Sequence, residues 1–222
     1  MDCTFGLEPY SPVSHDTLAW ATRDRPRPDL APPFDRGADT LWSTLLLRKL
    51  LENDSYRIYF INRFADLLNI SLHPDRVIAK IAELSGIIAP DMPLEMARWS
   101  SVWGGTLEGW QANVEGLRDY ARRRPQFIRR QIIDKFDLVD TASLTLEPPV
   151  GQGQVQVNTV TPDAYPWHGK YFQGVPVSLQ AQPAPGYRFS GWSDPALPQS
   201  PAVKIALPEF YSVHAIFSRS DR

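Results

Sequence analysis

An acidic residue at the start of the chain is the first candidate for chemistry. Asp2 lies in residues 1–6, which read as the end of a strand followed by a turn. A carboxylate in such a place can hold Mg²⁺ on a nucleotide, as acidic residues do in phosphoryl-transfer enzymes. Aspartate before a turn is also common in proteins of every kind. Taken alone, Asp2 is therefore a weak indication of a metal site.

A cluster of arginines is the second candidate. Guanidinium groups pair well with phosphates and carboxylates, so the cluster could bind a phosphate or an acidic partner. The alternative, which we favour, is the solvated end of a helix, where cations are also stabilised by the helix dipole. The cluster consists of Arg122, Arg123, Arg124, Arg129 and Arg130.

A set of aromatic residues in the C-terminal part is the third candidate. Exposed aromatic rings on a β module could stack on sugars, but a small module also needs aromatic rings to fill its core. We expect Phe189 and Trp192 in the core. Trp167 and Tyr171 are left open as a possible binding surface. The full set is Trp167, Tyr171, Phe172, Tyr187, Phe189 and Trp192.

Other classes of site find no support in the sequence. There is no glycine-rich phosphate loop, no His-Glu-x-x-His motif and no pair of histidines with ligand spacing. Cys3 is the single cysteine, which excludes a disulfide framework. The net charge of −2 argues against a general nucleic-acid or membrane-surface role. No membrane span is expected, and no export signal is recognised, so the chain as written should stay in the cytoplasm.

The elements that would position these residues change type along the chain. Residues 1–38 are rich in proline and should form a strand end and an extended loop. Residues 39–137 repeat apolar side chains at helical spacing. We expect one helix from Pro74, one from Leu107 that ends at Arg124-Pro125, and a last helix through Phe136.

Beyond residues 138–142 the apolar period becomes two, which is typical of strands. Gly151-Gln152-Gly153 is predicted to be a hairpin turn. The sequence therefore predicts an α+β chain of more than one domain, with a helical part followed by a small all-β module at residues 143–219. The strands are expected around Leu144–Leu146, Val155–Val157, Val177–Ala181, Tyr187–Phe189, Val203–Ile205 and Val213–Phe217.

The helical part resembles a known family in the order of its motifs. Asp2-Cys3-Thr4-Phe5-Gly6 resembles the end of the Asp-x-Asp-x-Thr-Phe/Trp-Gly segment of the CotH family, the spore-coat-type atypical protein kinases. Residues 60–69, Phe-Ile-Asn-Arg-Phe-Ala-Asp-Leu-Leu-Asn, and the segment Glu95–Trp99 are similar to later motifs of that family, as is the basic run with its closing helix at Arg124–Phe136. The resemblance covers residues 1–136 and implies the C-terminal lobe of a kinase-like fold.

The β module resembles the divergent InlB B-repeat, a small β-grasp-like unit that follows such kinases and occurs in bacterial surface proteins. The resemblance is carried by Trp167–Val177, by Ala181-x-Pro-x-x-Gly-Tyr-x-Phe-Ser-Gly-Trp192 and by Val213–Phe217. It implies contacts with a protein or a surface polymer, and a secreted or cell-surface location.

In the family, the ATP-binding lobe and the catalytic-loop aspartate lie upstream of the Asp-x-Asp segment. Here Met1 occupies the position between the two acids, and only Asp2 remains. We therefore expect a fragment without the N-terminal kinase lobe. The resemblance implies Mg²⁺ and ATP as cofactors of the full-length family, with Asp2 as a Mg²⁺ ligand, and we expect this chain alone to hold neither.

Three functions stay open at this point. The chain could be a non-catalytic C-terminal portion with a β module for surface contacts. It could belong to a protein that is an active Mg-ATP-dependent kinase in its complete form. It could also be an independent module that binds glycans or proteins. Truncation predicts an exposed apolar surface near Trp42, Tyr56 and Tyr59, or near the proline-rich loop that should cover it.

Overall fold

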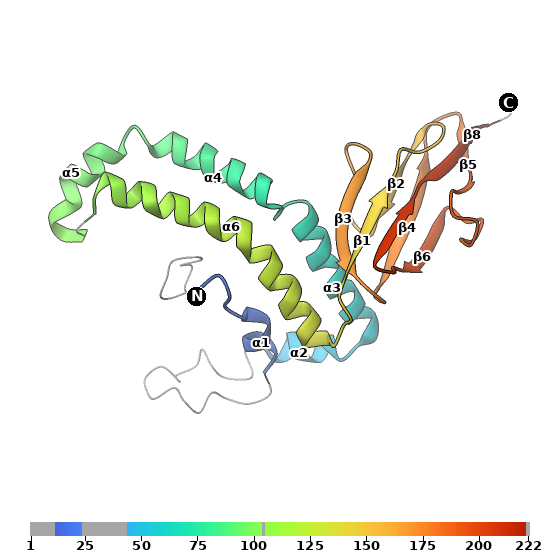
Figure 1. Cartoon of the computed structure of the whole chain (residues 1–222), viewed down its shortest axis with the longest axis horizontal. Helices are drawn as coiled ribbons and strands as arrows, with labels where there is room; N and C mark the ends of the chain where they lie inside the picture. The colour runs from blue at the N-terminus through green and yellow to red at the C-terminus, as the bar shows by residue number, and fades with distance from the viewer. Residues whose placement is uncertain (1–11, 24–43, 104, 221–222) are drawn as a thin grey trace. The chain divides into compact units, whose positions relative to one another are not determined.

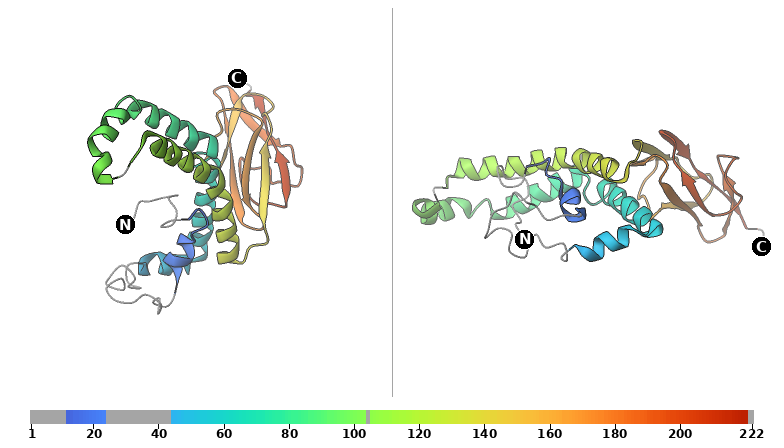
Figure 2. Two further views of the ribbon diagram at one scale, coloured as in Figure 1. Left: turned by 60° about the vertical axis from the view of Figure 1, so that its left-hand side comes forward. Right: turned by 90° about the horizontal axis from the view of Figure 1, so that it is seen from below.

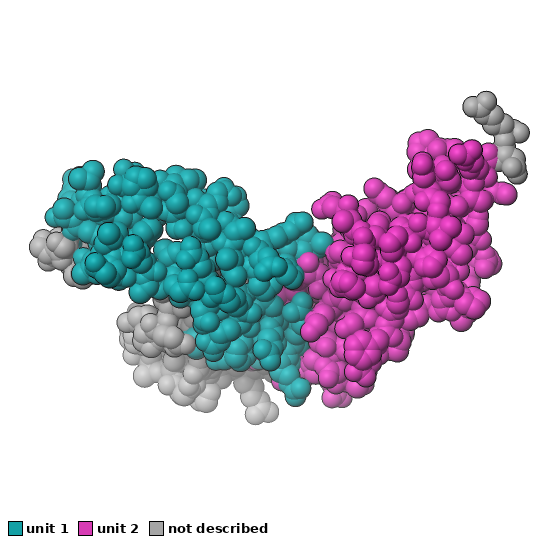
Figure 3. Space-filling model, turned by 45° about the horizontal axis from the view of Figure 1, so that its top comes forward, with its two compact units in different colours: residues 1–16, 70–130 teal, residues 17–69, 131–222 magenta. Residues whose placement is uncertain are grey.

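The computed structural model describes residues 12–23, 44–103 and 105–220, without the side chains of residues 100–103. These residues form two compact units, shown in different colours in Figure 3. One unit contains residues up to 16 together with 70–130, and the other contains residues 17–69 and 131–222. Helices occupy the N-terminal part and strands the C-terminal part, so the predicted α+β class is confirmed (Figure 1).

The first unit is a set of helices with a thin core. As expected, Pro74 occupies the first turn of α4, where its missing N–H costs nothing. No residue of α4 is buried, and Leu84, Ile87 and Ile88 keep between 47% and 66% of their surface exposed. The helices are α4 (Pro74–Ile88), α5 (Met92–Trp103) and the greater part of α6 (Leu107–Phe136).

The predicted helix end at Arg124-Pro125 is wrong. Helix α6 runs without interruption from Leu107 to Phe136 and contains Pro125 in its interior. An internal proline removes one hydrogen bond and costs about 3 kcal/mol. Helix formers on both sides and the buried position of Pro125 offset that cost. In addition, Arg124 Nη1 donates to the carbonyls of Val13 and His15, each at 2.7 Å, which anchors this turn in the first unit.

The second unit combines helices with the whole β module. Its best-packed helix is α3, whose Ile61, Ala65 and Leu68 are all buried. The Asn53 side chain accepts the backbone N–H of Tyr56 at 3.0 Å and caps the first turn of this helix. The helices are α1 (Thr17–Thr22), α2 (Leu45–Leu51), α3 (Asp54–Asn69) and the end of α6.

An apolar surface is exposed on these helices, as predicted. Tyr59 is 56% exposed and Leu46 on α2 is 73% exposed, while Tyr56 is half-buried. Trp42, the third residue of that prediction, lies outside the described residues. Because apolar side chains on packed helices normally face a core, this surface is a candidate for contact with further polypeptide.

The β module consists of three small sheets (Figure 1). Their strand orders are β3-β1-β7, β2-β4-β6 and β5-β8, and all pairs are antiparallel except β1 with β7. The strands are β1 (Thr141–Leu146), β2 (Gly153–Val157), β3 (Trp167–Phe172), β4 (Pro176–Pro183), β5 (Tyr187–Trp192), β6 (Ala202–Ala206), β7 (Phe210–Val213) and β8 (Ala215–Arg219).

Alternating apolar residues build the core of this module, because successive side chains of a strand point to opposite faces. Leu144, Val155, Val177 and Leu179 are each at most 1% exposed. Trp192 is also buried, as expected, and its indole N–H donates to the Ser200 carbonyl at 2.9 Å. Phe189 is only half-buried and meets Trp192 edge to face.

Three details of the β module differ from the sequence-based expectations. Gly151–Gly153 is no hairpin turn, since β1 pairs with β3 and β7 and not with β2. The chain crosses to another sheet there, and a Cβ on Gly151 (φ 83°) would meet the Phe217 carbonyl. Strand β3 was not expected, and the strand predicted around Val213–Phe217 is divided at His214 into β7 and β8.

Candidate functional site

Helix α3 presents a polar face to the β module. Asn62, Asp66 and Asn69 follow one another at intervals of four and three residues, which places them on one side of a helix. All three side chains form hydrogen bonds with the module, and α3 lies beside β3 in each view of Figure 2. The helix and the strands are therefore joined by polar contacts as well as by apolar packing.

Asp66 is the centre of these contacts. The residue is 1% exposed, and its Oδ2 accepts the hydroxyl of Thr159 at 2.6 Å and the Thr159 backbone N–H at 3.1 Å. Its Oδ1 accepts the hydroxyl of Tyr171 at 3.0 Å and an amide hydrogen of Asn158 at 3.4 Å. A buried carboxylate is expensive unless donors surround it, and this one has donors on both oxygens.

A tight turn after β2 supplies two of these donors. Asn158 adopts the left-handed conformation (φ 48°), which asparagine tolerates better than most residues. Its Oδ1 accepts the backbone N–H of Ser178 at 2.9 Å, and its own backbone N–H donates to the Ser178 carbonyl at 2.8 Å. The turn is thereby fixed against β4, which positions Asn158 and Thr159 for Asp66.

Asn69 covers the backbone of strand β3. Its side-chain amide donates to the Lys170 carbonyl and accepts the Lys170 N–H, both at 3.0 Å. The amide thus occupies hydrogen-bonding groups that a strand at the edge of a sheet would leave unpaired. This contact also fixes the end of α3 on the module.

Tyr171 does not lie on the surface of the β module. The residue is fully buried, and its hydroxyl is bound to Asp66. The core of so small a module needs a large ring at this position, so the ring is buried and is not available at the surface. Burial raises the pKa of Tyr171 well above its ordinary value, and the nearby negative charge and hydrogen bond of Asp66 raise the pKa further.

This raised pKa gives the protein a pH dependence that can be measured. The neutral Tyr171 hydroxyl is favoured in the folded state, so its stabilising effect is complete below pH ~10 and is lost as the pH rises toward the folded pKa. We expect the free energy of unfolding of the wild type to fall more steeply above pH ~10 than that of Tyr171→Phe, by up to about 1.4 kcal/mol per pH unit. Urea titrations of both chains between pH 8 and 11 measure this, and parallel profiles would contradict it.

A groove adjoins this polar contact. It lies between α3 and the β module, within the second unit, and encloses about 370 Å³. Asn62 Nδ2 donates to the Pro176 carbonyl at 2.8 Å, while Asn62 Oδ1 is buried without a donor. The groove is lined by Ser55, Ile58, Tyr59, Asn62, Arg63, Asp66, Asn158, Thr159, Pro176, Ser178 and Lys204.

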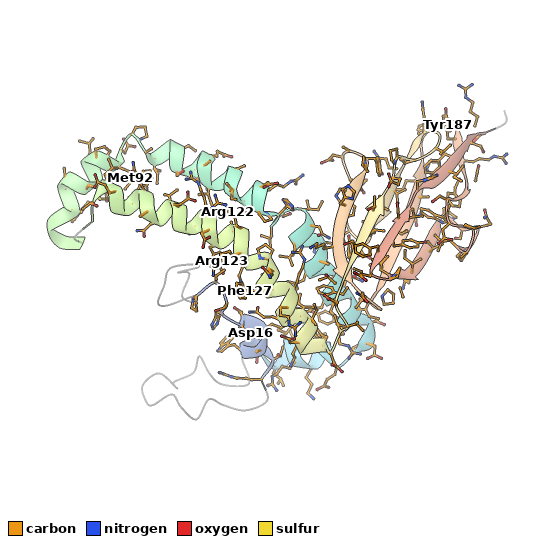
Figure 4. The ribbon with its side chains drawn as sticks, in the orientation of Figure 1. Asp16, Met92, Arg122, Arg123, Phe127 and Tyr187 are labelled. Carbon is orange, nitrogen blue, oxygen red and sulfur yellow. The ribbon has the colours of Figure 1, made fainter. Side chains whose placement is uncertain are left out.

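The arginine cluster is used for contacts within the chain. It lies in the middle of α6 and not at a helix end, since the helix continues to Phe136. Arg122 and Arg123, labelled in Figure 4, form ion pairs with Glu115 at 3.0 Å and Asp119 at 2.9 Å, respectively.

These contacts also shift ionisation within the cluster. The hydrogen bond from Arg122 lowers the pKa of Glu115, with a further contribution from Arg118. Burial lowers the pKa of Arg129. This arrangement does not resemble a phosphate site.

The other predicted site residues have different outcomes. Trp167 is half-buried at the start of β3, with its ring over Gly169, and its role in binding stays a prediction. Asp2 lies outside the described residues. Within the described ranges, no group of three or more His, Cys, Asp or Glu side chains could hold a metal ion.

No helix in the described part of the chain is long and apolar enough to cross a membrane.

Comparison with known proteins gives two family matches. Residues 14–128, more than half of the chain, match the CotH kinase protein family. Residues 150–220 match the divergent InlB B-repeat domain. The chain belongs to the CotH kinase protein family and carries a B-repeat domain after the CotH region, in the order that the sequence motifs predicted. Searches of curated proteins and of solved structures found no match.

The polar contact around Asp66 joins residues from the two matched family regions. Asp66 belongs to the CotH region, whereas Thr159 and Tyr171 belong to the B-repeat domain. The hydrogen bonds of Asp66 therefore join the two family regions inside one compact unit.

Sequence reasoning missed the residues of this contact. It selected residues 60–69 only as a family motif, and it did not consider Asn158 or Thr159. One signal was present, because Asn62, Asp66 and Asn69 share a helix face that is otherwise apolar. A polar row of this kind indicates a partner with matching donors, although it does not say which segment provides them.

Proposed function

We propose that the chain is the C-terminal portion of a CotH-type kinase and acts without catalysis of its own, as a binding part whose B-repeat domain makes surface or extracellular contacts. The observation that carries the proposal is the Asp66 contact. It makes the B-repeat domain a fixed extension of helix α3. A domain held in this way can present a bound surface component at a defined place relative to helix α3.

Exposed apolar side chains support the proposal that the chain is one portion of a larger kinase-like protein. Leu45 and Leu46 of α2 would bury apolar surface against a kinase N-terminal lobe, which the resemblance to the family implies upstream. In the complete form we propose Mg²⁺ and ATP as cofactors, with Asp2 as a Mg²⁺ ligand. Mg-ATP-dependent protein kinase activity of that complete form is the second candidate function, and the CotH family match favours it.

Nucleotide binding tests the proposal for this chain. We expect the melting temperature to be unchanged by Mg-ATP, because the described residues provide neither an acidic cluster nor a glycine-rich loop for it. Thermal melts with and without about 5 mM Mg-ATP measure this. That concentration exceeds the range of roughly 1 μM–1 mM in which most Michaelis constants fall. A clear upward shift that is lost in Asp2→Ala would show that the chain itself binds the nucleotide.

Surface binding is the other half of the test. We propose a secreted or cell-surface bacterial protein whose B-repeat domain recognises a protein or a surface polymer. A glycan array probed with the wild type and with Trp167→Ala separates these partners. Phe210→Ala is the matched control, because Phe210 is an exposed aromatic residue of the same module. Polymer binding that requires Trp167 would favour an independent glycan-binding module.

A further inference from the structure

The groove between α3 and the β module has the size of a small-molecule site. Its volume of about 370 Å³ falls within the range of roughly 300–1,000 Å³ that such sites occupy. Ser55, Tyr59 and Arg63 line it from α3, and Ser178 and Lys204 line it from the β module. Both family regions thus contribute to one site inside a single compact unit.

The floor of the groove contains an acceptor that lacks a donor. Asn62 is 7% exposed, and its Oδ1 has no hydrogen-bond partner among the described residues. Rotating the amide by half a turn would not help, because Nδ2 already donates to the Pro176 carbonyl, and an oxygen there would face another oxygen. A buried acceptor without a donor costs about 1–3 kcal/mol. A hydroxyl group of a ligand would supply the missing donor once the side chains that cover this buried oxygen move aside.

The charged groups of the groove favour an anion. Arg63 Nη1 donates to the Thr159 hydroxyl at 2.8 Å, and neither Arg63 nor Lys204 forms an ion pair with a described carboxylate. The one carboxylate of the groove, Asp66, is buried and has donors on both oxygens. Two cations therefore face one buried anion, which leaves positive charge at the mouth of the groove.

The remaining walls favour a hydroxylated ring. Tyr59 is 56% exposed and offers an aromatic ring, while Ser55 and Ser178 offer hydroxyl groups around the groove. An aromatic face with a few polar groups of fixed position is the usual lining of a small-molecule site. A sugar has one apolar face and many hydroxyl groups, and it matches this lining better than a bare anion does.

We propose that this groove binds one sugar unit that carries a single negative charge, either a carboxylate or a phosphate. The ligand hydroxyls would donate to Asn62 Oδ1, the ring would lie on Tyr59, and the anion would pair with Lys204 and Arg63. The inference rests on the proposed binding of a surface polymer, and it adds the location of the site and the chemical class of the ligand.

Calorimetric titration of the whole chain with D-glucuronate, D-glucose 6-phosphate and D-glucose tests this inference. We expect at least one charged sugar to bind ~10-fold or more tightly than glucose, and we expect that binding to weaken with salt. The tighter of the two charged sugars identifies the carboxylate or the phosphate as the natural anion. Lys204→Gln should weaken charged-sugar binding ~10-fold, and Lys204→Arg should retain it.

Lys170→Gln is the matched control. It removes the same charge from an exposed lysine of the β module that does not line the groove, and it should leave binding unchanged. Equal binding of charged and neutral sugars, or charged-sugar binding that survives Lys204→Gln, would overturn the inference. Polymer binding that depends on neither Lys204 nor Trp167 would also overturn it, while the proposed function would stand. Unchanged thermal melts of the variants establish that each one is folded.

Discussion

Replacing Asp66 with alanine is expected to lower the free energy of unfolding by about 2–4 kcal/mol. The change leaves the hydroxyls of Thr159 and Tyr171 and an N–H of Thr159 without their acceptor inside the protein. The buried Tyr171 hydroxyl costs about 1–3 kcal/mol when it loses its partner, and the exposed Thr159, whose donors can bind water, adds less. Hydrogen bonds to a charged group are stronger than neutral ones. Urea denaturation followed by circular dichroism measures the loss.

A matched control for Asp66 is present on the same helix. The Asp54 side chain is 80% exposed and pairs with Arg57 at 2.7 Å. Exposed pairs of this kind contribute at most about 1 kcal/mol, so Asp54→Ala should have a small effect. Asp66→Asn should be intermediate, because the amide keeps one acceptor oxygen and loses the charge. Equal effects of Asp54→Ala and Asp66→Ala would contradict the role assigned to Asp66.

The second large effect is expected from the core of the B-repeat domain. Phe172 on β3 is 1% exposed, and Phe172→Ala should cost about 3–5 kcal/mol through lost burial and the cavity it leaves. Phe210→Ala, at a ring that is 71% exposed, should change the free energy of unfolding by less than about 0.5 kcal/mol. Comparable losses in the two variants would show that the core described for β3 is wrong.

If α3 and the B-repeat domain form one cooperative unit, the loss in Phe172→Ala must also appear in helix α3. The hydrogen-exchange protection of the α3 amides and that of the strand amides should then be lost at the same urea concentration. A helix signal that survives after the strands have unfolded would show that the two regions are stable independently.

Periodicity was sufficient for most of the helices and strands. The apolar residues of α4 recur at helical spacing, and those of β1, β2 and β4 recur at every second residue. The structure has these elements where they were expected. The α+β class and the order of the two families followed from the same patterns and motifs. The domain boundaries of that prediction, at residues 38, 137 and 143, stay predictions.

The errors have local physical causes. Pro125 looked like a helix end because proline disfavours helix interiors, yet contacts of Arg124 and burial of the proline ring keep the helix intact. Gly151 looked like part of a hairpin turn, but the absence of a Cβ serves a close approach to the Phe217 backbone. In both cases tertiary contacts decided what local propensity could not.

The candidate site was harder to predict than the fold. Asp66 and Thr159 are 93 residues apart in the sequence, so their hydrogen bond depends on how the strands of the B-repeat domain are ordered. Tyrosine is a residue type that often lines binding sites, and only the packing of β3 shows that the ring of Tyr171 is in the core. The groove residues Asn62 and Lys204 come from different family regions, and no motif connects them.

Native-state hydrogen exchange tests most directly whether a CotH helix and a B-repeat domain form one structural unit through Asp66. The amides of Ile61–Leu68 on α3 and those of β3 should exchange with similar opening free energies, and in Asp66→Ala both sets should lose protection together. Exchange of α3 that is fast in the wild type, or protection of α3 that is unchanged in Asp66→Ala while the strands lose theirs, would contradict the account.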